Sequence, residues 1–245
     1  MSSRRKPATL SERSLVDGRS GGPGVRIRQA VPGDLGAVRE LVQLAGVELD
    51  DHTAAAVTDG TAGAALRAGL RDGREGFTRH MAERFFALPA GSPAAYLSAA
   101  LVLVAEHREH GIVGALVACP PPNVAAAALD QTERKITDPQ ARGQMVISVG
   151  IALAKVQAVA VAEHARGQRI GGAMLSLCSK IYLHCGFMFI YGQTAAGARL
   201  EDFYRRHGFD VLDEGAPVDF WVLFGFRSYF YPGPGERMFI RRARS

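Results

Sequence analysis

The chain contains little cysteine. Its 245 residues include only Cys119, Cys178 and Cys185, and none of them forms a Cys-x-x-Cys pair. Three scattered thiols exclude a disulfide framework and fit a reducing cytoplasm. We predict no metal site, and we expect Cys178 and Cys185 to be buried on one helical face as unreactive thiols.

Long apolar runs are also scarce. The longest, Met145–Ala162, has nearly membrane-spanning length, but Lys155 and Gln157 interrupt it and its β-branched residues suit buried strands. Near the N-terminus, Arg4-Arg5-Lys6 is followed by Pro7 and polar residues instead of the apolar stretch of a secretory signal. We therefore predict a cytoplasmic protein with no membrane segment.

The body of the chain lacks an excess of positive charge. The formal net charge is +5, but residues 1–24 and 236–245 together carry +6, so the other 211 residues sum to −1. This distribution argues against a basic groove for nucleic acid. Solvated basic ends explain it more simply than attachment to nucleic acid or to anionic lipid.

The remaining composition fits one soluble domain, because 47% hydrophobic and 22% charged residues suffice for a core. We predict a disordered basic tail over residues 1–24 and a single domain over 25–245, without internal repeats. Strands mixed with helices indicate an α/β (α+β) fold. The predicted strands cover residues 25–29, 101–106, 112–119, 145–161 (a pair or one bent strand), 187–191, 220–226 and 237–241; the predicted helices cover 35–45, 62–70, 77–88, 170–184 and 199–207.

A short glycine-rich turn, Arg166–Gly172, joins a predicted strand to a predicted helix. Its backbone N–H groups would lie at the positive end of the helix dipole, where they can bind a diphosphate. Spacing excludes two nucleotide motifs. A dinucleotide fingerprint needs Gly-x-Gly-x-x-Gly near the first strand, and a P-loop needs Lys-Ser/Thr where Ala173-Met174 stands.

The turn resembles the acyl-CoA motif of the GNAT superfamily of N-acetyltransferases, Arg/Gln-x-x-Gly-x-Gly/Ala, with Arg166-Gly-Gln-Arg169-Ile-Gly171 in these positions. Phe203–Phe209 resembles the family's C-terminal Phe/Leu-Tyr-x-x-x-Gly-Phe segment. Ala30–Leu35 and Ile112–Ala115 match two earlier landmarks in the family's order. The resemblance implies a mixed, mostly antiparallel central sheet flanked by helices, with helical insertions near residues 50–95 and 123–144.

The same resemblance implies acetyl-CoA as co-substrate. A splayed strand edge would bind pantetheine and polarise the thioester carbonyl, and the turn would bind pyrophosphate. Tyr204 would protonate the departing thiolate, a role that suits an unperturbed pKa of about 10. The implied cofactor-binding residues are Val159, Ala160, Val161, Arg166, Gly167, Gln168, Arg169, Ile170, Gly171 and Gly172.

Three positions depart from the family's pattern. Arg169 replaces the usual first glycine, which is tolerable if φ there is negative, and its charge could add to phosphate binding. Gly197 stands where relatives often have an asparagine that binds pantetheine. Lys155 stands where some relatives carry a glutamate base.

The general base is not evident from the sequence. Glu106, His107, Glu163 and His164 lie near predicted strand ends and could accept a proton, although each is more simply explained as a solvated loop residue. An amine that arrives deprotonated needs no dedicated base.

The family's acceptor pocket usually lies between the first helices and the final strands. Near it, Glu48, Asp50 and Asp51 could attract a cationic amine, or they could form an ordinary exposed acidic helix end. The aromatic segment Tyr229–Tyr231 could line a pocket or an oligomer surface, which leaves a homodimer open.

These observations predict transfer of an acetyl group from acetyl-CoA to a primary amine of a small molecule, by direct attack in a ternary complex. One alternative is acetylation of a protein or aminoacyl-tRNA amine, for which the basic ends are the only hint. The other is a GNAT-like CoA-binding or regulatory module without catalysis, which Gly197 and the missing base leave open.

Overall fold

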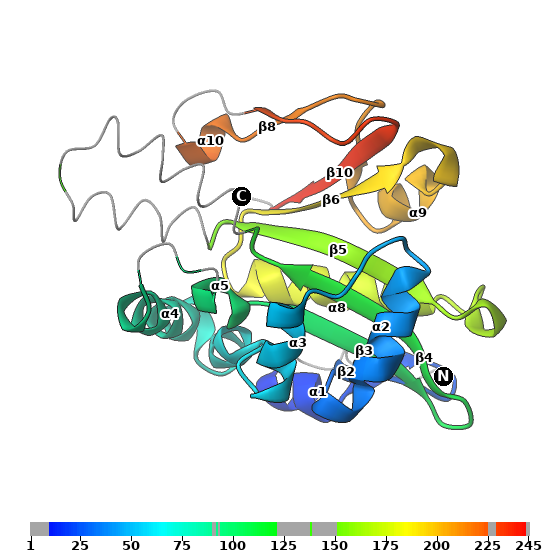
Figure 1. Cartoon of the computed structure of the whole chain (residues 1–245), viewed down its shortest axis with the longest axis horizontal. Helices are drawn as coiled ribbons and strands as arrows, with labels where there is room; N and C mark the ends of the chain where they lie inside the picture. The colour runs from blue at the N-terminus through cyan, green and yellow to red at the C-terminus, as the bar shows by residue number, and fades with distance from the viewer. Residues whose placement is uncertain are drawn as a thin grey trace, which may run out of the picture.

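One eight-stranded sheet organises the molecule (Figure 1). The computed structural model describes residues 10–89, 92, 94–121, 138, 151–224 and 229–243. The sheet has the order β1-β2-β3-β4-β5-β6-β10-β7, and each neighbouring pair is antiparallel except β5 and β6. This confirms the mixed, mostly antiparallel sheet that the sequence predicted. The strands are β1 Arg19–Gly22, β2 Val25–Gln29, β3 Leu101–His107, β4 Gly111–Cys119, β5 Leu153–Val161, β6 Phe189–Ala195, β7 Asp210–Val211 and β10 Glu236–Arg242, with β8 Val218–Asp219 and β9 Tyr229–Phe230 in a second, two-stranded sheet.

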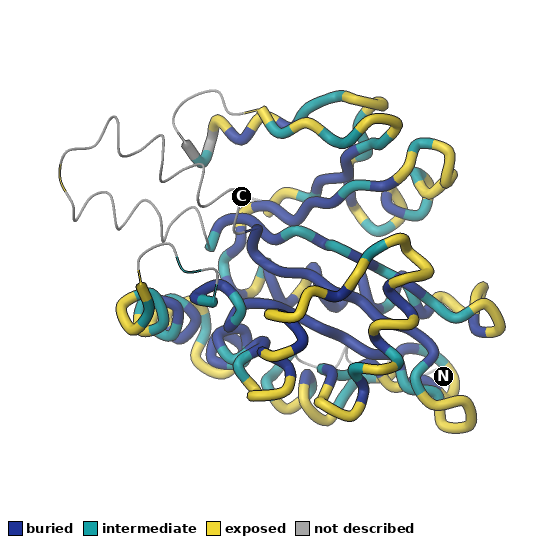
Figure 2. Tube along the Cα trace, viewed as in Figure 1, coloured by how far each residue is buried: buried dark blue, intermediate teal, exposed yellow. Residues whose placement is uncertain are grey.

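Helices cover both faces of the large sheet. One core lies under α8, α4 and α1, and a second core lies on the opposite face beside α2 and α3, which stand in front of the sheet in Figure 1. Figure 2 shows the strands buried between these two layers. The helices are α1 Glu12–Val16, α2 Leu35–Gln43, α3 Asp51–Thr58, α4 Ala64–Ala87, α5 Ala94–Leu97, α8 Ile170–His184, α9 Glu201–Arg206 and α10 Trp221–Phe224, with 3-10 turns η1 Pro32–Asp34, η2 Glu163–Ala165 and η3 Ala196–Ala198.

The prediction of a disordered tail is wrong for the residues after position 10. Ser11 caps α1 in a capping box with Ser14, and Leu15 is completely buried in the core under α8. β1 then pairs with β2. Buried Leu15 and the capping box of Ser11 and Ser14 form no periodic apolar pattern, so this ordered segment could not be predicted from the sequence. Residues 1–9 lie outside the described part of the chain.

The predicted helices near residues 62–70 and 77–88 form one element, α4, with a break at Gly73. The backbone there has φ +72 and ψ −166, which is not helical. Glycine alone adopts that conformation without strain. The predicted helical insertion near 50–95 therefore consists of α3, α4 and α5, while the insertion near 123–144 lies outside the described residues apart from Asp138.

The strand predicted at residues 220–226 is wrong over its first part, because residues 221–224 form α10. Asp219 Oδ1 accepts a hydrogen bond of 2.9 Å from the N–H of Trp221, which starts a helical turn. Phe220 is fully buried, whereas Trp221 is 56% exposed.

The three cysteines are free and buried, as expected for Cys178 and Cys185. Burial raises the pKa of the Cys119 and Cys185 thiols to about 12. Among the described residues, no helix combines the length and apolarity needed to cross a membrane, and no group of three or more His, Cys, Asp or Glu side chains is placed to hold a metal ion.

Candidate functional site

An extra residue divides β5 into two halves. Val156 and Ala158 pair with consecutive residues of β4, and Gln157 pairs with neither. Such a bulge reverses the sheet face on which the following side chains lie. Val156 accordingly packs in the core under α8, while Ala158 packs on the opposite face beside α2 and α3. Beyond the bulge, Val159 and Val161 face α8.

β5 and β6 separate at the same point. Their parallel pairing runs from Leu153 with Phe189 to Val156 with Gly192 and stops there. Residues 158–161 of β5 still pair with β4, but their other edge has no strand partner among the described residues. Backbone N–H and C=O groups at such an edge are available to a ligand.

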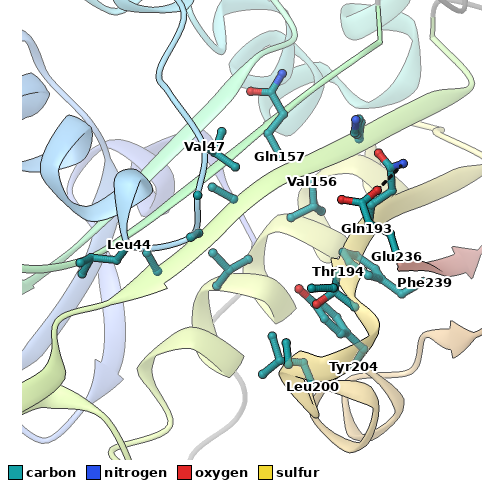
Figure 3. Close-up of a pocket in the computed structure, with 18 of the residues that line it drawn as sticks. Leu44, Val47, Val156, Gln157, Gln193, Thr194, Leu200, Tyr204, Glu236 and Phe239 are labelled. Atoms are coloured by element: carbon teal, nitrogen blue, oxygen red, sulfur yellow. Dashed lines mark hydrogen bonds between the residues drawn. The ribbon is translucent and has the colours of Figure 1, made fainter. Parts of the chain in front are cut away.

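Two cavities meet where these strands separate. The first, of about 1110 Å³, we call the turn cavity, and it is lined by the glycine-rich turn, β1 and α9. The second, of about 730 Å³, we call the strand cavity, and it is lined by β5, β6, β10 and the segment between α2 and α3 (Figure 3). The residues that line both cavities are Val159, Val161, Arg166, Leu200 and Tyr204.

All eleven residues predicted for the site line at least one of these cavities. Gly167 to Gly172 line the turn cavity, and Ala160 lines the strand cavity. The structure thus brings the turn, the β5 edge and Tyr204 together, although Tyr204 lies more than 30 residues after the turn in the sequence.

The start of α8 carries three backbone N–H groups without partners. Ala173 donates the first α-helical bond, to the carbonyl of Arg169 at 3.0 Å, and no described residue accepts from Ile170, Gly171 or Gly172. No side chain caps the helix. Three free donors at the positive end of a 15-residue helix form an anion site.

Arg169 has the conformation of the glycine that it replaces. Its φ is +64 and its ψ is 12, in the left-handed region, so the condition under which an arginine would be tolerated without strain, a negative φ, is not met. A side chain costs about 1–2 kcal/mol there. This strained residue directly precedes Ile170, Gly171 and Gly172, which line the turn cavity, so the strain lies at the anion site.

Two neighbours fix the turn. Arg166 donates from Nε to the carbonyl of Val161 at 3.2 Å, which ties the turn to the end of β5. His207 of the α9 end packs so closely on Gly172 that a Cβ atom there would collide with the imidazole ring. The pKa of His207 is lowered, mainly by burial and then by Arg206 and Arg241, so this ring is neutral near pH 7.

Tyr204 is held rigidly at the shared wall. Its ring stacks on Phe239 of β10 with centroids 3.7 Å apart and planes inclined by 13°. Phe239 reaches this position because Gly192 leaves its ring free space. The hydroxyl makes no hydrogen bond to a described residue, and Figure 3 shows it directed into the cavity. Burial raises the pKa of Tyr204 to about 12.

The four base candidates from the sequence line neither cavity. Glu106 is bound to Arg26 at 2.7 Å and to Arg28 at 3.1 Å. His107 stacks on His110, which in turn contacts His164, at the turn between β3 and β4. The three histidine rings therefore lie together at the turn of the β3–β4 hairpin, outside both cavities.

The strand cavity instead holds carboxylates from two other places. Glu48 and Asp50, at the segment before α3, line it, whereas Asp51 has a 99% exposed side chain beside Arg39. Glu236 lines it from the start of β10. Sequence reasoning missed Glu236 because only the pairing of β10 with β6 brings it to the site.

The turn cavity also has a wall that sequence reasoning assigned to a tail. Gly21, Gly22 and Pro23, at the end of β1, line it opposite the turn. Leu15 is buried in the core and Leu10 packs against it, but two leucines without helical periodicity give only a weak signal in the sequence that this segment docks on the domain.

No protein-family model and no curated protein sequence matches the chain. Solved structures do match its arrangement of strands and helices. One is an acetyltransferase of the GNAT family from Staphylococcus aureus, 11% identical, with a TM-score of 0.47 over 90% of this chain and 99% of the other. Another is ribosomal-protein-alanine N-acetyltransferase from Brucella melitensis, 18% identical, with a TM-score of 0.43 over 88% and 98%.

A third match, from Elizabethkingia anophelis, is a GNAT family acetyltransferase with acetyl-CoA bound, 15% identical, with a TM-score of 0.36 over 60% of this chain and 78% of the other. The chain is similar to GNAT acetyltransferases. Likeness at this level carries no argument about activity, so the chemistry of this chain rests on its own two cavities.

Proposed function

We propose that this protein transfers an acetyl group from acetyl-CoA to the primary amine of a small molecule, as a GNAT-type N-acetyltransferase. The observation that carries the proposal is the meeting of the two cavities at Tyr204 and the unpaired edge of β5. Direct transfer needs both substrates bound together with their reacting atoms adjacent. Two cavities with one shared wall suit such a ternary complex.

The turn cavity suits acetyl-CoA, which supplies the thioester. The free N–H groups of Ile170, Gly171 and Gly172 suit its diphosphate. The free edge of β5 offers backbone groups to the pantetheine amides, beside the apolar side chains of Val159 and Val161. A donor at the thioester oxygen would stabilise the negative charge that develops there during attack.

Tyr204 is the group that protonates the departing thiolate. Since burial raises its pKa to about 12, the hydroxyl keeps its proton throughout the neutral range. A thiolate that leaves the thioester beside Tyr204 carries a full negative charge in a partly apolar cavity, where burial disfavours the charged form and makes it a better proton acceptor. The two groups are therefore matched for proton transfer.

The strand cavity suits a small amine. Its volume of about 730 Å³ lies within the range of about 300–1,000 Å³ that is typical of small-molecule sites. The segment between α2 and α3 forms one of its walls, so the acceptor binds between this segment and the strands. These features favour a compact acceptor over a protein or tRNA amine.

Replacing Tyr204 with phenylalanine tests the proposal. We expect kcat for the best amine of a broad panel to fall about 10²–10⁴-fold, since the general acid is lost, while the Kd of acetyl-CoA stays within about 2-fold. Thiol release and calorimetry measure the two quantities. Tyr191→Phe is the matched control, because Tyr191 is buried but lines neither cavity, and it should retain activity.

Full activity in Tyr204→Phe would refute the assigned acid. Binding of acetyl-CoA by the wild type without thiol release for any amine would instead favour a regulatory module.

The raised pKa of Tyr204 makes a second prediction. An acid must be protonated to act, and a group with a pKa of about 12 is protonated at every lower pH. We therefore expect kcat to show no descending alkaline limb below about pH 10. A rate profile between pH 6 and about 10 checks this, with circular dichroism at each pH as the control for unfolding. A fall in kcat near pH 8–9 would contradict the role.

A further inference from the structure

We propose that Glu236 binds the protonated amine of the acceptor and removes its proton, and that the acceptor is accordingly an alkylamine that is cationic at neutral pH. This inference rests on the proposed acetyl transfer. Ammonium nitrogen has no lone pair, so a cationic acceptor must lose a proton before it attacks the thioester. A carboxylate in contact with the acceptor is the simplest group to receive it.

The geometry of Glu236 fits this task. Its Oε2 accepts a hydrogen bond from the N–H of Gly233 at 2.8 Å. It accepts another from Nε2 of Gln193 at 3.2 Å (Figure 3). No described residue donates to Oε1. One oxygen is thus anchored, and the other is free to accept a hydrogen bond from a ligand in the strand cavity.

β10 carries both this carboxylate and the ring that supports the acid, and Glu236 and Tyr204 line the same cavity. Glu236 pairs with Ala195 and Phe239 pairs with Gly192, so the two side chains, three positions apart, lie on opposite faces of the sheet. Both residues line the strand cavity, and Phe239 also stacks on Tyr204. One strand therefore positions both the proposed base and the proposed acid.

The other charged groups of the cavity are less suited to this role. Asp50 also has one anchored oxygen, but Oδ1 accepts from the N–H of Thr53 at 2.8 Å, so the start of α3 fixes it and not β10, which carries the ring that stacks on Tyr204. Glu48 lies on the segment before α3, and no described residue donates a hydrogen bond that would fix its carboxylate. Lys155 on β5 is itself a cation, and Arg166 is bound to the carbonyl of Val161. Glu48 and Asp50 add negative charge that attracts a cationic acceptor.

The proton balance of the proposed reaction is closed. The ammonium gives one proton to Glu236, and the neutral nitrogen forms the bond to the acetyl carbon as the carbon–sulfur bond breaks. Tyr204 gives its proton to the thiolate. The acetylated nitrogen, which carries a positive charge after the attack, then loses its second proton, and Tyr204 recovers a proton through solvent. Glu236 releases its proton to solvent, so the products are the acetylated amine, CoA thiol and one proton.

Glu236→Gln tests the inference, with a primary alkylamine and an aromatic amine of similar size as acceptors. Glutamine keeps an oxygen for the N–H of Gly233 but removes the charge. For the alkylamine we expect kcat/KM to fall about 100-fold at pH 7, with the acetyl-CoA Kd unchanged. For the aromatic amine, which is already neutral, we expect a fall of less than about 5-fold. Glu236→Asp should restore part of the alkylamine activity.

The pH profile gives a readout that a structural role would not move. In Glu236→Gln the alkylamine rate should continue to rise up to the acceptor's own pKa of about 10. In the wild type, where Glu236 accepts the proton of the amine, the alkylamine rate should stop rising at a lower pH. Asp51→Asn removes a carboxylate outside the cavity and should leave both acceptors unaffected.

Binding provides the measurement that separates this inference from the proposed function. Calorimetry with CoA-loaded protein should show the alkylammonium binding at least 10-fold more weakly to Glu236→Gln. Equal loss for both acceptors, or an unchanged alkylamine rate and affinity, would overturn the role of Glu236 and leave acetyl transfer standing. Loss of thiol release in the wild type, with this binding difference intact, would refute acetyl transfer but retain the ammonium site.

Discussion

The two cavities recognise their ligands by different means. The turn cavity offers mainly backbone groups from one short stretch of chain, the residues from the end of β5 to the start of α8. The strand cavity offers side chains from four separate stretches, including Glu48, Gln157, Gln193 and Glu236. Backbone recognition depends on conformation and tolerates many side-chain changes. Side-chain recognition can be altered one residue at a time, so we expect the acceptor to vary while the donor is kept.

Gly172→Ala is the strongest test of this division. A Cβ atom at Gly172 would collide with the ring of His207, so this ring, the start of α8 or the end of α9 must shift. We expect the acetyl-CoA Kd to rise at least about 10-fold, because the N–H groups lose their alignment. The amine KM at saturating acetyl-CoA should change by less than about 2-fold. Calorimetry and initial rates measure the two effects.

Gly171→Ala is the matched control. A Cβ atom there would lie 3.5 Å from Val161 Cγ2 and 3.7 Å from Val159 Cγ1, which are ordinary contacts. We expect acetyl-CoA affinity close to that of the wild type. Equal weakening by both variants would show that any side chain at the turn interferes, and that the His207 contact does not define the cavity.

The difference between the two cavities also explains which of their residues could be predicted from the sequence. The turn and Tyr204 were predictable because strand, turn and helix follow each other within a few residues, and because Phe203–Phe209 matched a second local segment. Glu236 was not, since its place depends on the pairing of β10 with β6. The bulge at Gln157 was equally hidden, because an apolar run does not reveal on which face each residue lies.

The fold, too, could be predicted only where the sequence has a clear local pattern. Strong alternation and helical periodicity predicted β2, the β3–β4 hairpin and α8. α1 and β1 were missed because one buried leucine gives no period. Residues 221–224 were assigned to a strand although the Asp219 side chain starts a helical turn there, since a local cap outweighs alternation over so short a segment.

Arg169→Gly has the smallest expected effect on acetyl-CoA binding. It distinguishes the contribution of the backbone N–H groups of the turn cavity from that of the Arg169 side chain. Glycine removes the cost of about 1–2 kcal/mol for a side chain in the left-handed region but adds disorder to the unfolded chain, so we expect a net gain of about 0.5–1 kcal/mol in unfolding free energy. Because the arginine side chain is exposed, its loss should weaken acetyl-CoA binding by no more than about 3-fold.

Two further variants separate the effect of the Arg169 charge from the effect of the left-handed backbone. Arg169→Ala removes the charge and keeps the strain, so it should match the glycine variant in acetyl-CoA affinity without any gain in stability. Arg199→Gly relieves the second left-handed residue, φ +53, which lines neither cavity, and should stabilise the protein without changing affinity. Chemical unfolding and calorimetry in low and high salt provide the measurements. A loss of affinity above 10-fold that disappears in high salt would assign phosphate binding to the guanidinium instead of the backbone, because only the charge is screened.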